Sequence, residues 1–132
     1  MPKKRVLLVD DTPVVRSLVR HLIELEPDFE ISGEAENGRD ALEKAENLKP
    51  DLIILDLVMP VMTGLDAAPL LRKLLPNTRI ILFTVQEGRE VERLAHAAGI
   101  HAVVSKNQAV SKLILQARSL LASSPAKLRS AS

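Results

Sequence analysis

The chain contains no cysteine, tryptophan or tyrosine, and only two of its 132 residues are phenylalanine. The lack of cysteine excludes a disulfide framework and a thiolate metal site, and it is typical of a reducing compartment. An excess of one charge is also missing, because 18 Lys and Arg stand against 17 Asp and Glu. That balance excludes a strong net positive charge that would attract nucleic acid or a membrane. The apolar run 6–9 is too short for a signal peptide or a spanning helix, so we expect a cytoplasmic protein.

What the sequence does contain is an apolar stretch in its middle, between Pro50 and Pro60. The unbroken apolar run 52–55 is typical of a central parallel strand that is buried on both faces. Asp56 follows this run directly. An unpaired charge in such surroundings costs on the order of several kcal/mol. We therefore expect Asp56 either to face a crevice at the carboxyl end of the strand or to have a cationic partner.

Segments of strand character alternate with segments of helical period along most of the chain, as expected for one compact domain. We expect strands at 5–9, 29–35, 51–56, 79–84 and 101–105. We expect helices that open at Thr12-Pro13, at Arg39, at the capping box Thr63–Asp66, at Glu87 and at Asn107. This alternation predicts an α/β fold with a doubly wound parallel sheet. Because crossovers are right-handed, the carboxyl ends of all strands would share one edge.

That shared edge would collect three carboxylates, a hydroxyl and an ammonium group, from Asp10, Asp11, Asp56, Thr84 and Lys106. Three carboxylates repel one another, and one lysine cannot neutralise them, so a divalent cation is expected. A site built only from oxygen ligands favours Mg²⁺ (or Mn²⁺) over zinc. A metal, an ammonium and a hydroxyl around a carboxylate form a site for a phosphoryl group. The simplest chemistry is attack of Asp56 on phosphorus, which gives an aspartyl-phosphate.

From Arg5 to about Ala122 the chain resembles the receiver domain of bacterial response regulators, the phosphoacceptor domain of two-component phosphorelay signalling. The matching pieces are Val9-Asp10-Asp11, the run D-x-x-M-P-x-x-x-G from Asp56 to Gly64, Thr84 and Lys106. The resemblance implies a flavodoxin-like, five-stranded sheet with the strand order 2-1-3-4-5. It also implies a receiver domain over 1–122, and 123–132 reads as an unstructured tail or the start of a linker.

The resemblance further implies a role for each matching residue. Asp56 would accept a phosphoryl group from a phosphohistidine on a sensor histidine kinase or a phosphotransfer protein. Asp11, Asp56 and the Val58 backbone carbonyl would bind Mg²⁺, with Asp10 acting largely through a water. Thr84 and Lys106 would bind phosphoryl oxygens. Such a domain catalyses only its own phosphorylation and dephosphorylation, so it is not an enzyme on other substrates. The surface of its fourth helix, last strand and last helix would bind an output partner or a second copy.

The sequence departs from the family pattern at three positions. Val103 stands where most receivers have Tyr or Phe, Asn107 replaces the proline common after the lysine, and Val85 replaces a small residue. Val103 motivates an alternative, a pseudo-receiver that binds proteins without phosphorylation. A phosphatase acting on free substrates would need a second acid placed as a general acid and room for a lid or specificity domain, and we expect neither in this chain.

Overall fold

The computed structural model describes residues 2–122, and the segment 123–132 predicted as a tail lies outside these described residues. Within residues 2–122, five strands and five helices alternate. In order they are β1 Lys4–Val9, α1 Pro13–Glu24, β2 Phe29–Ala35, α2 Gly38–Leu48, β3 Leu52–Leu55, α3 Gly64–Leu74, β4 Arg79–Thr84, α4 Arg89–Ala97, β5 Ala102–Ser105 and α5 Val110–Ala122. Among the described residues no helix is long and apolar enough to cross a membrane.

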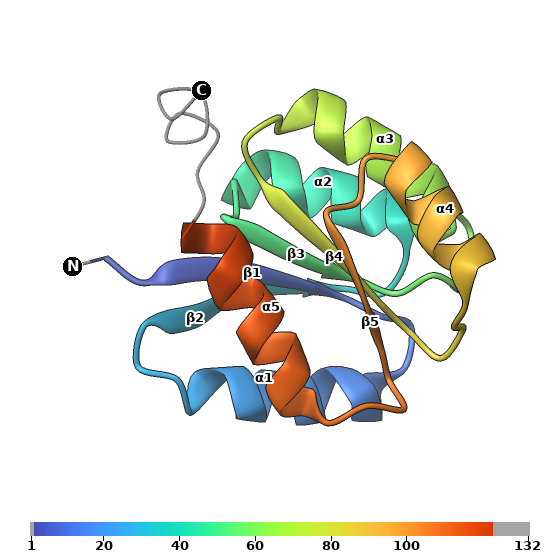
Figure 1. Cartoon of the computed structure of the whole chain (residues 1–132). Helices are drawn as coiled ribbons and strands as arrows, with labels where there is room; N and C mark the ends of the chain where they lie inside the picture. The colour runs from blue at the N-terminus through green and yellow to red at the C-terminus, as the bar shows by residue number, and fades with distance from the viewer. Residues whose placement is uncertain (1, 123–132) are drawn as a thin grey trace, which may run out of the picture.

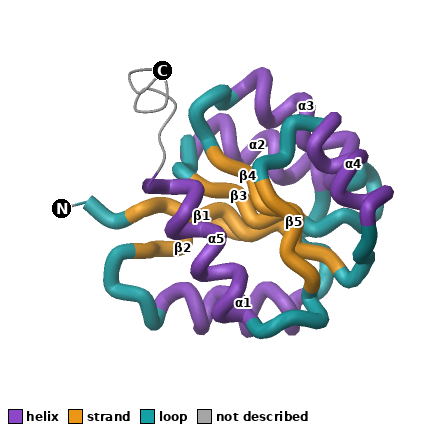
Figure 2. The backbone as a smooth tube through the Cα atoms, viewed as in Figure 1, coloured by secondary structure: helices purple, strands orange, loops and turns teal. Residues whose placement is uncertain are grey.

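The strands form one sheet in the order β2-β1-β3-β4-β5, and every neighbouring pair is parallel. This confirms the predicted flavodoxin-like, doubly wound topology. Helices cover both faces of the sheet: α1 and α5 lie on one face, and α2, α3 and α4 lie on the other (Figures 1 and 2). Since all strands run the same way, their carboxyl ends meet at one edge of the sheet.

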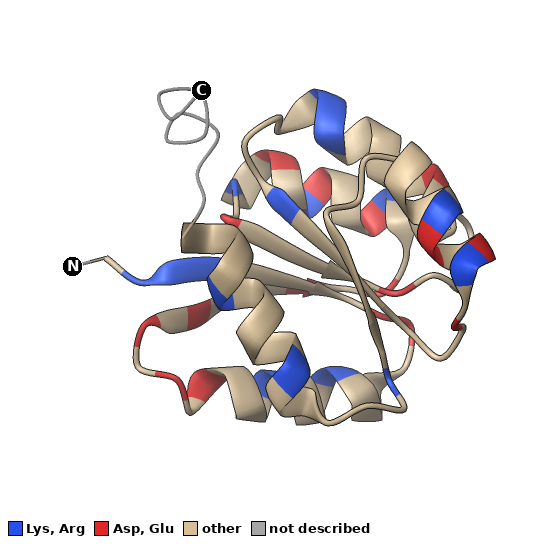
Figure 3. Cartoon of the chain, in the orientation of Figure 1, with Lys and Arg blue, Asp and Glu red and all other residues tan. Residues whose placement is uncertain are grey.

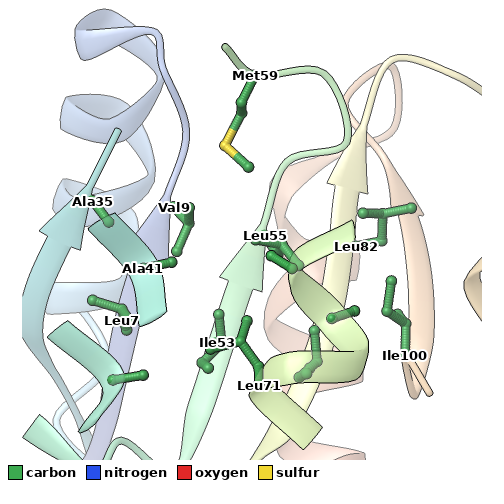
Figure 4. Close-up of a cluster of buried hydrophobic side chains, with 14 of the residues drawn as sticks. Leu7, Val9, Ala35, Ala41, Ile53, Leu55, Met59, Leu71, Leu82 and Ile100 are labelled. Carbon is green, nitrogen blue, oxygen red and sulfur yellow. The ribbon is translucent and has the colours of Figure 1, made fainter. Parts of the chain in front are cut away.

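Two hydrophobic clusters hold these layers together, one on each face of the sheet. Successive residues of β1 alternate between them: Leu7 and Val9 pack toward α2 and α3, whereas Val6 and Leu8 pack toward α1 and α5. Figure 4 shows the first of these clusters, with side chains from the strands meeting Ala41 and Leu71 of the covering helices. All four residues of β3 are buried. A central strand therefore needs the unbroken apolar run seen in the sequence.

Side chains cap two helices, and the sequence predicts the cap at Thr63 but not the one at Asn37. The Asn37 side chain accepts a hydrogen bond from the Asp40 amide at the start of α2, and Thr63 accepts one from the Asp66 amide at the start of α3. Pro69 lies inside α3 without delaying its start. Thr12 is the residue before α1, but its side chain makes no capping hydrogen bond. Pro13 at the first helical position, with its preset φ, begins α1 instead.

Two predicted helix starts were wrong. α5 begins at Val110, not at Asn107, because Ser105 closes a turn there: its hydroxyl accepts from the Asn107 amide and its carbonyl from the Gln108 amide. α4 begins at Arg89, two residues after the predicted Glu87, with Gly88 before it at φ 116°.

The helical spacing of the apolar residues predicts that α1 buries Val14, Val15, Leu18, Val19, Leu22 and Ile23, and the structure buries only some of them. Val14 and Leu18 are 76% and 55% exposed, whereas Val19 and Ile23 are buried. A helix that lies on a sheet buries only the side that faces the strands, so apolar residues at its margins stay in solvent.

Candidate functional site

The candidate site lies at the edge where the carboxyl ends of the strands meet. Asp10 and Asp11 follow β1, Asp56 follows β3, and Lys106 follows β5. Figure 3 shows the acidic segments in red after β1 and β3, with a basic segment in blue at the end of β5. The parallel topology thus gathers residues that are distant in the sequence.

The three predicted carboxylates are close together. One oxygen from each of Asp10, Asp11 and Asp56 lies within 4.8 Å of the others. Asp10 and Asp56 are buried, with 5% and 7% of their surface exposed, while Asp11 is exposed to solvent. The void beneath the buried pair has a volume of only about 10 Å³. This is room for about one water, so the pair rests on a packed core and can receive a ligand only from the solvent side.

Lys106 neutralises part of this acidic charge. Its Nζ lies 2.6 Å from Asp10 Oδ2 and 3.3 Å from Asp56 Oδ2. The Lys106 backbone amide donates to the Thr84 carbonyl at 2.8 Å, which fixes the end of β5 against β4. One ammonium group against three carboxylates leaves the site with a net negative charge.

Backbone groups of neighbouring residues fix the orientation of Asp56. Its Oδ1 accepts a hydrogen bond from the Leu57 amide at 2.8 Å, and its backbone amide donates to the Val9 carbonyl at 2.9 Å. Burial raises the pKa of the Asp56 carboxyl above its ordinary value, and the charge of Asp10 raises that pKa further. Lys106 and the Leu57 amide oppose both effects. A cation at this site would favour the ionised, nucleophilic form of Asp56.

The loop after β1 is held by Arg16, a residue of α1. The Arg16 guanidinium donates to the backbone carbonyl of Asp10, and its Nε lies 3.1 Å from Glu34 Oε1. Asp10 Oδ1 also accepts from the Thr12 amide at 2.9 Å. Arg16 thus links the acidic loop to α1 and β2. Its spacing alone could not reveal this contact, because Arg20 recurs on the same side of the helix.

Thr84, the predicted hydroxyl, is fully buried at the end of β4. Its Oγ1 donates to Gln86 Oε1 at 2.8 Å and accepts from the Gln86 amide at 3.3 Å. The hydroxyl is therefore bound to the following loop.

Two of the positions that depart from the family pattern lie near Thr84 in the sheet and its loop. Val85 is 56% exposed, and Val103 packs at the edge of the core in register with Leu82.

The loop between β3 and α3 is tightly constrained, and it contains Val58. A Cβ on Gly64 would lie 2.1 Å from the Asp56 carbonyl oxygen, so only glycine fits there. The Met62 amide donates to the Pro60 carbonyl at 2.7 Å across Val61, whose φ is 69°. This hydrogen bond closes a three-residue γ-turn, and the positive φ at its centre is strained for a β-branched residue such as Val61. Val58, on the first part of this loop, has a side chain that is 59% exposed.

The donor set fits Mg²⁺. It consists of carboxylate oxygens from three residues, two of them already oriented by backbone amides, and hard oxygen ligands are those Mg²⁺ prefers. Among residues 2–122, Asp11 makes no hydrogen bond with its side chain, so its carboxylate is available to a cation. The negative charge that Lys106 leaves unneutralised would attract the cation.

Comparison with known proteins agrees with this geometry. Residues 6–118 match the response regulator receiver domain family. The chain is 43% identical over 107 residues to a protein-glutamate methylesterase/protein-glutamine glutaminase of Maricaulis maris, covering 80% of this chain and 27% of that protein. It is 46% identical over 85 residues to the nitrate/nitrite response regulator NarL of Escherichia coli, covering 64% of this chain and 39% of that protein. The chain thus spans well under half the length of these curated relatives.

Solved structures show the same fold. The response regulator domain of Thermotoga maritima CheB superimposes with a TM-score of 0.86 at 31% sequence identity, covering 93% of this chain and 99% of that one. Family, topology and the acidic edge of the sheet therefore agree, and the chain belongs to the response regulator receiver domain family of two-component systems.

Proposed function

We propose that this receiver domain takes part in a phosphorelay by accepting a phosphoryl group on Asp56. The observation that supports this most is the cluster of Asp10, Asp11 and Asp56, whose carboxylate oxygens lie within 4.8 Å, with Lys106 Nζ 3.3 Å from Asp56. A purely structural ion pair needs one carboxylate for one ammonium group. This site holds two more carboxylates than Lys106 needs, one of them exposed to solvent.

The proposed reaction is a phosphoryl transfer from a phosphohistidine. A carboxylate oxygen of Asp56 attacks phosphorus and forms a P–O bond, while the P–N bond breaks and its electron pair stays on the imidazole nitrogen, which takes a proton. Lys106 and the Thr84 hydroxyl would bind phosphoryl oxygens of the product. For this, Thr84 must exchange its hydrogen bond with Gln86 for one with the phosphoryl group.

Asp10, Asp11, Asp56 and the Val58 backbone carbonyl would hold Mg²⁺. When bound, Mg²⁺ would neutralise charge that develops on the phosphoryl oxygens. The residues of the chain then orient the nucleophile. The Leu57 amide holds Asp56 Oδ1 in place, which leaves Oδ2 for attack. The same site would admit a water for hydrolysis of the acyl phosphate, so the domain would also dephosphorylate itself.

The proposed partners rest on this chemistry and on the family to which the chain belongs. A sensor histidine kinase or a phosphotransfer protein would supply the phosphoryl group in the cytoplasm. The surface of α4, β5 and α5 would bind an output partner or a second copy of the chain. Arg89, Glu90 and Arg93 lie on α4 in this surface, where Arg93 pairs with Glu90. We assign no nucleic-acid or membrane binding to residues 1–122, and no activity on other substrates.

The experiment that tests the proposal is phosphorylation by small phosphodonors. The protein is incubated with acetyl phosphate or phosphoramidate and Mg²⁺, and its intact mass is measured. The mass of one phosphoryl group should appear on the wild type, disappear with EDTA, and be absent from Asp56→Asn. Labelling that persists in Asp56→Asn would contradict the assignment.

The alternative is a pseudo-receiver that binds proteins without phosphorylation. Val103 favours it, since this short side chain stands in β5 where most receivers carry an aromatic ring. Phosphorylation and hydrogen exchange together distinguish the two functions. A receiver would take a phosphoryl group and would then change its amide exchange in the loops after β4 and β5. A pseudo-receiver would take no phosphoryl group and would still bind its partner.

A further inference from the structure

Two arginines and a histidine form a second group at the opposite edge of the sheet from the acidic site. Arg72 is on the last turns of α3, Arg79 is the first residue of β4, and His101 directly precedes β5. Arg72 Nη1 lies 2.9 Å from His101 Nε2, and Arg79 Nη1 lies 3.5 Å from the same nitrogen. The other ring nitrogen, Nδ1, faces the Ile80 amide at 3.0 Å.

These contacts place an N–H donor against both nitrogens of one imidazole. A neutral imidazole has only one acceptor nitrogen, because the other carries the hydrogen. If Nδ1 accepts from the Ile80 amide, Nε2–H points at the Arg72 guanidinium, which has only donors. The other tautomer would accept from Arg72 but would set Nδ1–H against the Ile80 amide. Protonation of the ring would remove its last acceptor, so in every state the cluster lacks at least one acceptor.

The charges show the same imbalance. Burial and the nearby charges of Arg72 and Arg79 lower the pKa of His101 to about 4, so the ring is neutral at pH 7. Within residues 2–122, neither Arg72 nor His101 forms an ion pair with a carboxylate. Among the described residues, the Arg72 guanidinium otherwise hydrogen-bonds only to the Pro76 carbonyl, at 3.3 Å. Glu92 and His96 of α4 line a hollow beside His101, but among the described residues neither hydrogen-bonds to the ring or to Arg72.

We propose that this group, Arg72 with Arg79 and His101, is a binding site for a small inorganic oxyanion such as phosphate or sulfate. The anion would lie on the solvent side, since Arg72 and His101 are partly exposed whereas Arg79 is buried. Its oxygens would accept from the Arg72 guanidinium and from His101 Nε2–H, while the Ile80 amide keeps Nδ1 as its acceptor. The positive charge of Arg79 behind the ring would add attraction. Anion binding removes the donor–donor contact and offsets the repulsion between the two guanidinium groups.

The test is a phosphate titration followed by ¹H–¹⁵N spectra of the Ile80 amide and the His101 ring. It is run on the labelled protein at pH 7 with EDTA, against sodium chloride at equal ionic strength. Phosphate should give saturable shifts at these two groups, and chloride should not. Arg72→Gln should weaken the apparent affinity about tenfold, because a charge-assisted hydrogen bond is lost.

Lys73→Gln is the matched control, since it removes one positive charge from the next, exposed residue of the same helix and should leave the affinity unchanged. His101→Asn is a second test variant, because it lacks the Nε2–H donor and should also weaken binding. Shifts that do not saturate, that chloride reproduces, or that persist with equal affinity in Arg72→Gln and His101→Asn would overturn the proposal. These signals are distinct from those of Asp56 and Lys106, so the outcome is independent of the proposed phosphorylation.

Discussion

At the scale of single residues, the fold overrides the ordinary preferences of several groups. Gly64 is required because the chain passes against the Asp56 carbonyl, and Val61 adopts a positive φ that a β-branched residue rarely takes. His101 is neutral because burial and two arginines hold its pKa down. Each of these constraints has a consequence for stability that can be measured.

Val61→Gly tests the backbone strain beside the candidate site. Glycine takes positive φ freely, so the folded loop should lose about 1 kcal/mol of strain, which offsets the entropy that glycine adds to the unfolded chain. We expect the free energy of unfolding, measured by urea denaturation without Mg²⁺, to match or exceed that of the wild type. Val58→Gly is the control. Val58 is similarly exposed and is not among the described residues with positive φ, so this change should destabilise by up to about 1 kcal/mol. Equal losses in both variants would show that Val61 is unstrained.

His101 predicts a loss of stability in acid. A base whose folded pKa is lowered opposes folding once it is protonated, so its contribution is complete above the unfolded value of 6.5 and declines as the pH falls toward about 4. A shift of that size gives an upper bound of roughly 3 kcal/mol, which screening of this partly exposed ring reduces to about 1–2 kcal/mol. Urea denaturation from pH 7 to pH 4 measures it.

His101→Asn should remove this part of the pH dependence, because an amide does not titrate and can still accept from the Ile80 amide. His96→Asn, at an exposed position, should leave the pH dependence as it is in the wild type. An identical slope in wild type and His101→Asn would contradict the lowered pKa.

At the scale of elements, the loops at the sheet edge are tied to the helices that follow them. α1 is linked to the acidic loop through Arg16, which contacts both the Asp10 carbonyl and Glu34 of β2. β4 is linked to its loop through Thr84 and Gln86, and Asn107 Nδ2 lies 3.4 Å from Glu87 across the two loops. We therefore expect a change at the site to reach the loops that precede α4 and α5.

Arg16→Gln should weaken Mg²⁺ binding. Loss of the guanidinium frees the backbone of Asp10, so the carboxylates are less preorganised, and we expect the affinity to fall about three- to tenfold. Calorimetric titration with Mg²⁺ measures it. Arg20→Gln is the matched control, since Arg20 also pairs with Glu34 but does not contact Asp10. Comparable weakening in both variants would show that the Mg²⁺ affinity depends on the positive charge near Glu34 and not on the contact with Asp10.

Thr84→Ala should separate phosphorylation from its transmission. The variant keeps Asp10, Asp11, Asp56 and Lys106, so acetyl phosphate should still label it. The change in amide exchange in the loop 85–88 should disappear, because no hydroxyl remains to leave Gln86 for the phosphoryl group. A phosphorylated Thr84→Ala protein with wild-type exchange changes would show that transmission takes another route.

At the scale of the whole molecule, the fold and the clustered carboxylates could be predicted because both follow from regular patterns. The alternation of strand and helix predicts a parallel sheet, and a parallel sheet places the residues after its strands at one edge. Contacts set by tertiary packing could not be predicted. The Ser105 turn that delays α5, the Arg16 contact and the cluster around His101 each join residues whose spacing carries no period.

The central claim is that Asp56, among three neighbouring carboxylates, carries the phosphoryl group. Borohydride reduces an acyl phosphate to an alcohol and so converts the modified aspartate to homoserine. The wild-type protein, phosphorylated with acetyl phosphate and Mg²⁺, is reduced, digested and sequenced by mass spectrometry. We expect homoserine at position 56 only, and none when EDTA is present. Homoserine at position 10 or 11, or no conversion at all, would contradict the account.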